Sequence, residues 1–135
     1  MNSAIATFIL QNVLVPGGYL TSTGWVRSLV EKRICDLNGE PLPWISYPAI
    51  YFLSTRIQPA MKIFEYGSGF STLWWSRRVS SVISCEHDIE WYNKMQNLMP
   101  KNVEYNFIPL EYGGAYSKKI SEYTAEFDIV IIDGR

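Results

Sequence analysis

Three carboxylates and one glycine turn are the residues of this chain that could do chemistry together. Glu65 ends an apolar run and precedes the turn Gly67-Ser68-Gly69, where bare backbone lets a ligand approach closely. Glu86 ends the next apolar run, about 20 positions further on, which is where an acid commonly binds a ribose diol. Asp133 ends a later apolar run and could serve as a general base. These positions predict a site for a small polar cofactor.

The elements that must position these residues follow an alternating pattern. Four apolar runs have the length and composition of strands: about 62–66, 82–86, 103–109 and 127–133. Helical patterns lie between the first three of them, at about 70–79 and 88–98. Strands that alternate with helices predict an α/β fold with a parallel sheet and right-handed crossovers. Carboxyl ends of parallel strands share one edge, so the three acids should lie near each other.

The first 60 residues predict a helical N-terminal extension, and residues 61–135 the cofactor-binding domain. Three elements are expected in the extension: a short helix or strand over 4–14 that packs on the domain, a helix from Ser22 or Thr23 as its cap to about Cys35, and a helix from Pro48 to about Ile57 with Ala49, Phe52 and Leu53 as its apolar stripe. The proline-rich loop before Pro48 carries Trp44, Ser46 and Tyr47, which could close over a pocket.

Composition limits the partners of this chain. A length of 135 residues suits one domain, and 47% hydrophobic with 19% charged residues is typical of a globular chain. The net charge of −1 gives no reason to expect a nucleic acid or an anionic membrane as partner. No run reaches the ~20 apolar residues of a membrane span. Cys35 and Cys85 are expected to be reduced thiols, so we predict a cytoplasmic protein.

The acid before the glycine turn separates two classes of cofactor. A dinucleotide fingerprint has a third glycine where this chain has Thr72. Glu65 would also repel a pyrophosphate, on the order of several kcal/mol in a cleft of low dielectric. The same carboxylate suits S-adenosylmethionine, which carries an ammonium group and a ribose diol but no phosphate. The sequence therefore favours this cofactor, and a nicotinamide-dependent oxidoreductase stays open as an alternative.

Longer strings carry a family resemblance over about residues 41–135. With Phe64-Glu65-Tyr66-Gly67-Ser68-Gly69-Phe70-Ser71-Thr72-Leu73-Trp74-Trp75, Cys85-Glu86-His87-Asp88-Ile89-Glu90-Trp91-Tyr92 and the run 127–134, the chain resembles a class I S-adenosylmethionine-dependent methyltransferase. It is similar to a bacterial subgroup of small methyltransferases associated with glycan or secondary-metabolite genes. The resemblance implies a Rossmann-like sheet in the order 3-2-1-4. It also implies methyl transfer to a small-molecule or sugar-like acceptor, which we expect to be an O-methylation.

The resemblance assigns roles residue by residue. It implies that Glu65, Gly67, Ser68 and Gly69 line the methionine end of the cofactor, that Glu86 binds the ribose, that His87 lies near the adenine, and that Asp133 is the catalytic residue at the transfer centre. Trp91 and Tyr92 could flank the adenine, and the segment 112–116 could form a flap. We expect no metal ion, because Asp133 is the only candidate ligand in view.

The last strand raises the question of what covers it. Each position of 129–132 is apolar, which is typical of a strand with helices on both faces. We therefore expect this chain to be the first part of a longer domain, or a second copy to cover the strand in a homo-oligomer. The remaining strands of the family are missing, and the chain by itself could be inactive. A catalytically incomplete half-domain that acts by association is the second alternative.

Overall fold

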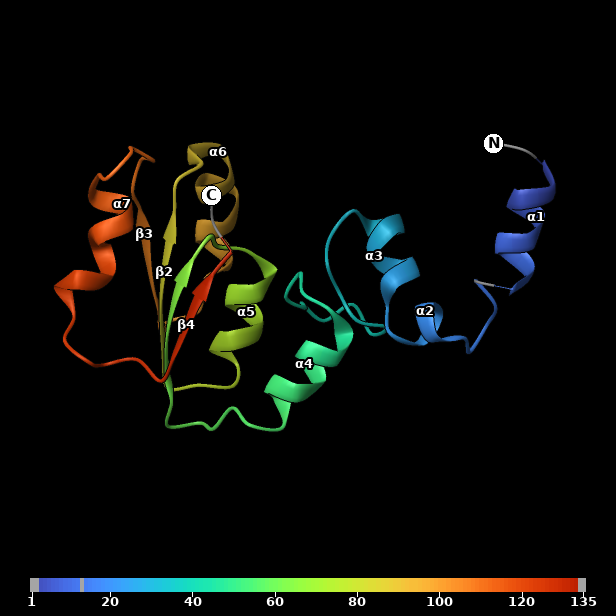
Figure 1. Cartoon of the computed structure of the whole chain (residues 1–135), viewed down its shortest axis with the longest axis horizontal. Coiled ribbons are helices and arrows are strands. Elements are labelled where there is room, and N and C mark those ends of the chain that lie inside the picture. The colour runs from blue at the N-terminus through green and yellow to red at the C-terminus, as the bar shows by residue number, and fades with distance from the viewer. Residues whose placement is uncertain (1–2, 13, 134–135) are drawn as a thin grey trace.

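The computed structural model describes residues 3–12 and 14–133. The predictions that fall on Val13, Gly134 and Arg135 lie outside these residues. Four strands form one parallel sheet in the order β3-β2-β1-β4: β1 Lys62–Tyr66, β2 Ser81–Glu86, β3 Val103–Phe107 and β4 Ile129–Ile132. Helices flank this sheet (Figure 1). The α/β Rossmann-like fold and the strand order are confirmed.

Strand register brings the predicted site residues to one edge. Tyr66 at the end of β1 pairs with Cys85 of β2 and with Ile132 of β4. The same edge of the sheet therefore carries the glycine turn after β1, Glu86 at the end of β2, and Asp133 directly after β4. β1 is the innermost of these strands, and its last four residues are all buried. A parallel strand covered on both faces is expected to be apolar on both faces, and Glu65 is the exception in β1.

Helices cover both faces of the sheet (Figure 1). The helical elements that follow β1 in the chain are α5 Phe70–Ser76, α6 Ile89–Met95 with the 3-10 turn Gln96–Leu98, α7 Ala115–Lys118 and the 3-10 turn Lys119–Glu122. On one face Ile63 packs with Trp74 and Trp75 of α5. On the other face Phe64 packs with Tyr116 of α7. Successive residues of β1 point to opposite faces, which places Glu65 on the α5 face with Ile63.

Four helices precede the sheet: α1 Ser3–Asn12, α2 Tyr19–Ser22, α3 Trp25–Glu31 and α4 Tyr47–Ser54. Leu42 and α4 belong to the same core cluster as β1 and α5. The segment around residues 42–57 is therefore part of the core of the sheet domain. The helix expected within residues 4–14 is present as α1, but the prediction that it packs on the domain is wrong, because none of its described residues is buried.

The helix predicted from Ser22 or Thr23 to Cys35 is shorter in the structure: α3 covers Trp25–Glu31, and Ser22 is the last residue of the separate helix α2. The N-cap of α3 is Gly24, with φ of +88° and no side-chain hydrogen bond. A Cβ at this position would lie 2.3 Å from the Asp36 backbone, so only glycine fits the approach. The chain reverses at Lys32, which ends α3 with φ of +52°. The close approach of Gly24 to the backbone of residues 35 and 36 therefore decides where α3 begins. The helical spacing of apolar residues in the sequence carries no information on that contact.

The helix predicted from Pro48 is present, but its inner face is different. Ser46 is the N-cap and accepts a hydrogen bond from the Ala49 amide at 3.4 Å. Ile50 and Leu53 pack on the core, whereas Phe52 is 53% exposed. The expected stripe of Ala49, Phe52 and Leu53 was therefore correct only at Leu53.

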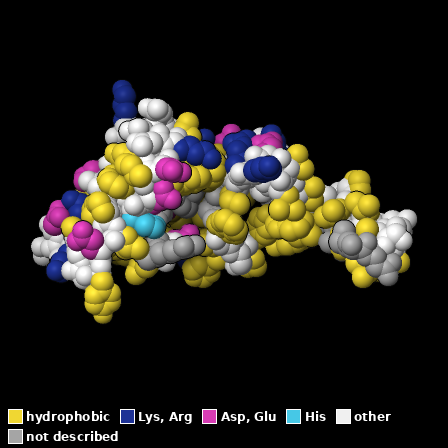
Figure 2. All heavy atoms as spheres, turned by 90° about the horizontal axis from the view of Figure 1, so that it is seen from above, with side chains coloured by type: hydrophobic (Ala, Val, Ile, Leu, Met, Phe, Trp, Pro, Cys, Tyr) yellow, Lys and Arg dark blue, Asp and Glu magenta, His cyan; other side chains and the backbone are white. Residues whose placement is uncertain are grey.

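The outer edge of β4 has no paired strand within the described residues. Ile129 and Ile131 pack against the α5 face, but Ile132 on the opposite face is 78% exposed. Hydrophobic side chains also gather over the N-terminal helices (Figure 2), including Ile5, Phe8, Leu29 and Val30. No helix in the described ranges is both long enough and apolar enough to cross a membrane.

Candidate ligand site at the carboxyl edge of the sheet

The glycine turn after β1 has one position that requires glycine. Gly67 has φ of +86°, a backbone conformation that side chains with a Cβ rarely adopt. Its amide donates to the Cys85 carbonyl at 2.9 Å, which fixes the turn to the end of β2. Gly69 is extended, and a Cβ there would touch the Trp91 ring at 3.7 Å. The turn is therefore held in place, with its second glycine beside an indole.

Glu86 binds this turn to the loop that follows β2. The carboxylate is only 4% exposed. Its Oε2 accepts from the Ser68 amide at 3.0 Å and from the Ser68 hydroxyl at 2.8 Å. Its Oε1 accepts from the amides of His87 and Asp88, at 2.8 and 2.9 Å. A carboxylate has about four acceptor sites, so a ribose hydroxyl would bind here by replacing the Ser68 hydroxyl.

Tyr105 of β3 extends the hydrogen-bond chain that runs from Glu86 to Ser68, and this residue was not predicted from the sequence. Its hydroxyl lies 2.6 Å from the Ser68 hydroxyl. Burial raises the pKa of Tyr105, so the phenol keeps its proton at neutral pH. Tyr92 stacks on the Tyr105 ring at 4.5 Å between centroids, which identifies Tyr92 as a packing residue. The alternation of β3 could have placed Tyr105 on the α6 face, but nothing in the sequence linked it to Ser68.

The structure does not place Glu65 on the surface of a ligand site. The side chain is fully buried, and Trp75 Nε1 donates to its Oε1 at 2.9 Å. The hydroxyls of Thr72 and Ser84 donate to its Oε2. Thr72 Oγ1 also accepts from the Gly69 amide at 3.0 Å. The expected direct contact with the cofactor is corrected: Glu65 faces α5 because of strand alternation, and it positions the turn through Thr72.

His87 lies beside Glu86, on the side away from the turn. Its Nδ1 is 3.3 Å from Glu86 Oε1, is buried, and has no hydrogen-bond partner among the described residues. Its ring meets Tyr116 edge to face at 5.6 Å. Burial raises the pKa of Tyr116, whose hydroxyl lies near the Gly67 backbone without a hydrogen bond of normal geometry. Tyr112, by contrast, is fully exposed, so the two ends of the expected flap differ.

A cavity of about 900 Å³ lies in front of the turn. Ser68, Gly69, Ser71 and Asp133 line one side of it. Helix α3 and the loop before α4 line the opposite side. The cavity is at the carboxyl edge between β1 and β4, where the order 3-2-1-4 changes direction. Ligands of open α/β sheets bind at such a switch point.

The cavity brings together only some of the predicted residues. Ser68, Gly69 and Asp133 line it, as do Trp44, Ser46 and Tyr47 from the loop expected to close over a pocket, and Trp91. Glu65, Gly67, Glu86 and His87 do not line it. The contribution of α3 was not predicted from the sequence: Trp25 and Leu29 of α3 line the cavity, together with Lys32, which follows the helix. The sequence did offer one signal for this wall: α3 carries apolar residues on more than one side, so some of them had to lie outside the core.

Asp133 presents a carboxylate to the cavity. Its amide donates to the Tyr66 carbonyl at 3.0 Å, which extends the pairing of β4 with β1. Its side chain makes no hydrogen bond or ion pair with the residues that the structure describes. An unpaired carboxylate can accept a proton or bind a cation. Within the described ranges, no group of three His, Cys, Asp or Glu side chains could hold a metal ion.

No protein-family model, curated protein or solved structure matches this chain. The fold and the site therefore define the class of protein by geometry alone. It is an α/β Rossmann-like domain with a cavity at the switch point of its sheet.

Proposed function

We propose that this chain is an S-adenosylmethionine-dependent methyltransferase that acts on an oxygen of a small-molecule acceptor. One observation carries the proposal: Ser68 and Gly69 of the turn line the same cavity at the switch point as Asp133, whose carboxylate has no partner among the described residues. The volume of about 900 Å³ is within the range of about 300–1,000 Å³ for ligand pockets. That is room for a cofactor together with a small acceptor.

The residues present fit this cofactor at two points. Gly69 and Ser68 offer close backbone approach on the cavity wall. Glu86 lies directly behind Ser68, 2.8 Å from its hydroxyl, and would receive the ribose hydroxyls in place of that hydroxyl. Glu65 supports the turn from behind through Thr72. The proposed contact of Glu86 with the ribose suits a ligand that carries a diol.

When bound, S-adenosylmethionine supplies a methyl group on a sulfonium, so that an acceptor oxygen forms the new C–O bond while the C–S bond breaks and its electron pair goes to sulfur. Asp133 would hold the acceptor hydroxyl and take its proton onto a carboxylate oxygen. Trp44 and Tyr47 would enclose the acceptor and exclude water, since both line the opposite wall. Orientation of the acceptor is then the main contribution of the protein.

Isothermal titration of the chain with S-adenosylmethionine tests the cofactor site. We expect saturable binding, and a Kd at least about tenfold weaker for Glu86→Gln, because a charged acceptor contributes about 1.5–3 kcal/mol. Glu126→Gln is the matched control, since Glu126 is exposed and lies outside the cavity. A folded chain that binds NAD and not S-adenosylmethionine would support the oxidoreductase instead. Equal affinity of the Glu86 and Glu126 variants would refute the ribose role.

A catalytically incomplete half-domain that acts by association stays the second candidate function, because part of β4 is uncovered. Val130 and Ile132 expose apolar surface on one face, and the outer edge of β4 is unpaired within the described residues. A second chain or further strands could cover it. Sedimentation equilibrium would show a stable complex that Ile132→Ser weakens. The cytoplasmic location is part of the same proposal and stays a prediction.

A further inference from the structure

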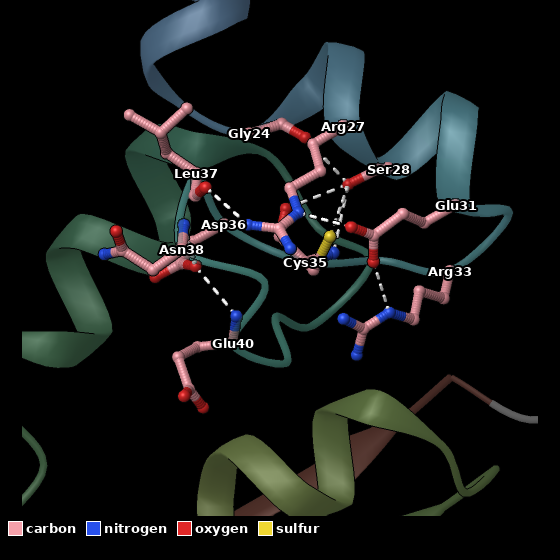
Figure 3. A network of polar contacts seen from close by, with 10 residues as sticks. All are labelled: Gly24, Arg27, Ser28, Glu31, Arg33, Cys35, Asp36, Leu37, Asn38 and Glu40. Atoms are coloured by element: carbon pink, nitrogen blue, oxygen red, sulfur yellow. Dashed lines mark hydrogen bonds and ion pairs between the residues drawn. The ribbon is translucent and has the colours of Figure 1, made fainter.

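One wall of the cavity carries a lysine side chain without a partner among the described residues. Lys32 follows the last residue of α3 and lines the cavity; its backbone amide donates to the Ser28 carbonyl, but its side chain makes no ion pair or hydrogen bond within the described ranges. The neighbouring Arg33 differs, because its Nε is bound by Glu31 at 2.7 Å. Figure 3 shows Glu31 between Arg27 and Arg33, so one carboxylate serves both guanidinium groups. Among the described residues, Lys32 is therefore the cation of this wall whose side chain has no carboxylate partner.

The serine hydroxyls of the cavity are already engaged. The Ser28 hydroxyl accepts from the Cys35 amide, and its one proton lies within reach of the carbonyls of Gly24 and Cys35 (Figure 3). Ser46 accepts from the Ala49 amide as the cap of α4, and Ser68 is bound by Glu86 and Tyr105. A sugar that entered would bring several hydroxyl groups and find few free partners. Buried hydroxyls without partners cost about 1–3 kcal/mol each, which disfavours a polyhydroxylated acceptor.

Most of the remaining cavity surface is apolar and aromatic. Trp25, Leu29, Trp44 and Ile45 come from the N-terminal side, and Phe70 comes from the start of α5. Trp44 is 81% exposed although it lies in an ordered loop, so its ring is available to stack on a ligand. Such a wall suits a flat apolar body.

We propose that the acceptor in this cavity is a hydroxyaryl carboxylate, bound through its anionic group by Lys32 and through its ring by Trp44. Charge complementarity with Lys32, engaged serine hydroxyls and an aromatic wall select this chemistry over a sugar. The term acceptor rests on the proposed function. The binding of the molecule itself does not require the cofactor.

The test is isothermal titration of the chain, without cofactor, with 4-hydroxybenzoate. We expect binding, and a Kd at least about tenfold weaker for 4-hydroxybenzyl alcohol, which keeps the ring and lacks the charge. Lys32→Gln should weaken 4-hydroxybenzoate to the level of the alcohol, and Lys101→Gln should leave it unchanged. Lys101 is exposed and lies outside the cavity, which makes it the matched control. Trp44→Ala should weaken both aromatic probes.

Any of the following results would overturn the proposal. One is equal affinity for 4-hydroxybenzoate and the alcohol, and one is no binding of either by the folded chain. Another is binding of glucuronate, a sugar acid, as tight as that of 4-hydroxybenzoate. The last is a Lys32→Gln variant that loses affinity for S-adenosylmethionine alone, because Lys32 would then belong to the cofactor.

Separate titrations distinguish this inference from the proposed function. If 4-hydroxybenzoate binds and S-adenosylmethionine does not, the proposed methyl transfer fails and the ligand class of the cavity holds. If only S-adenosylmethionine binds, the cofactor site holds and the acceptor class fails. Both exposed variants, Lys32→Gln and Trp44→Ala, alter side chains outside the core clusters, so we expect them to fold.

Discussion

Replacing Glu65 with leucine is the perturbation that most directly tests how the glycine turn is held. The substitution removes the acceptors of three buried donors, Trp75 Nε1 and the hydroxyls of Thr72 and Ser84. Each buried donor without a partner costs about 1–3 kcal/mol. The two hydroxyls can rotate toward each other, since their oxygens are 3.5 Å apart, whereas the indole N–H cannot. We therefore expect Glu65→Leu to lower the free energy of unfolding by about 3–5 kcal/mol.

Glu65→Gln separates the hydrogen bonds from the charge. A glutamine can accept from Trp75 and donate to the two hydroxyls, so at neutral pH it should change stability by less than about 1 kcal/mol. Urea unfolding followed by tryptophan fluorescence measures both variants. If Glu65→Leu were as stable as the wild type, the carboxylate would not be holding α5 and the turn. Thr72→Val, which keeps the volume and removes one hydroxyl, provides an independent variant of the same network.

The charge of Glu65 also predicts a pH dependence. Burial is the largest influence and raises the pKa of Glu65 above its ordinary value of 4.5, against the lowering effect of its hydrogen bonds. The folded state then holds the proton more tightly than the unfolded state. Its contribution to stability is fully present below pH 4.5 and is lost as the pH rises through the folded pKa. The difference in stability between wild type and Glu65→Gln should follow this direction. A difference that grows in favour of the wild type with rising pH would refute the reasoning.

Three further predictions follow from the same contacts. Gly67→Ala forces a Cβ into φ of +86°, so it should lower stability by about 1–2 kcal/mol and also weaken cofactor binding, whereas Gly113→Ala, at φ of +62° in open space, should affect stability alone. Tyr105→Phe removes the hydroxyl bound to Ser68, so it should weaken S-adenosylmethionine while leaving 4-hydroxybenzoate unaffected; equal loss of both ligands would contradict a role confined to the turn. Burial raises the pKa of the Cys85 thiol to about 12, so iodoacetamide at pH 8 should label it only after unfolding, and rapid labelling of the folded chain would show that β2 opens.

Much of the sheet could be predicted from local pattern. Apolar runs with turns between them located all four strands, and the helix predicted from about residue 88 is α6, whose N-cap Asp88 accepts from the Glu90 amide at 2.9 Å. The glycine turn and Glu86 came from their spacing, because strand ends of a parallel sheet must share an edge. These features depend on neighbours in the chain or on the regular geometry of strands.

Other features needed contacts between residues far apart in the chain. The break at Gly24 depends on the Asp36 backbone, which the helical pattern of α3 does not report. The inner face of α4 was assigned wrongly because the packing of Ile50 on the sheet decides it. Tyr105 reaches Ser68 only because β3 and the turn meet across β2. Side chains that meet in this way leave no periodic signal.

The sequence by itself determined which residues stand at the carboxyl ends of the strands, and the tertiary structure decided what each of them faces. Glu65 is the penultimate residue of β1 and Glu86 is the last residue of β2, yet Glu65 is enclosed under α5 while Glu86 binds the turn. The cavity depends still more on long-range packing, because α3 and Trp44 form the wall opposite Asp133. Strand alternation determines which side chains share a face of the sheet, but not which helix covers that face. The burial of apolar surface between distant segments decides where the helices lie.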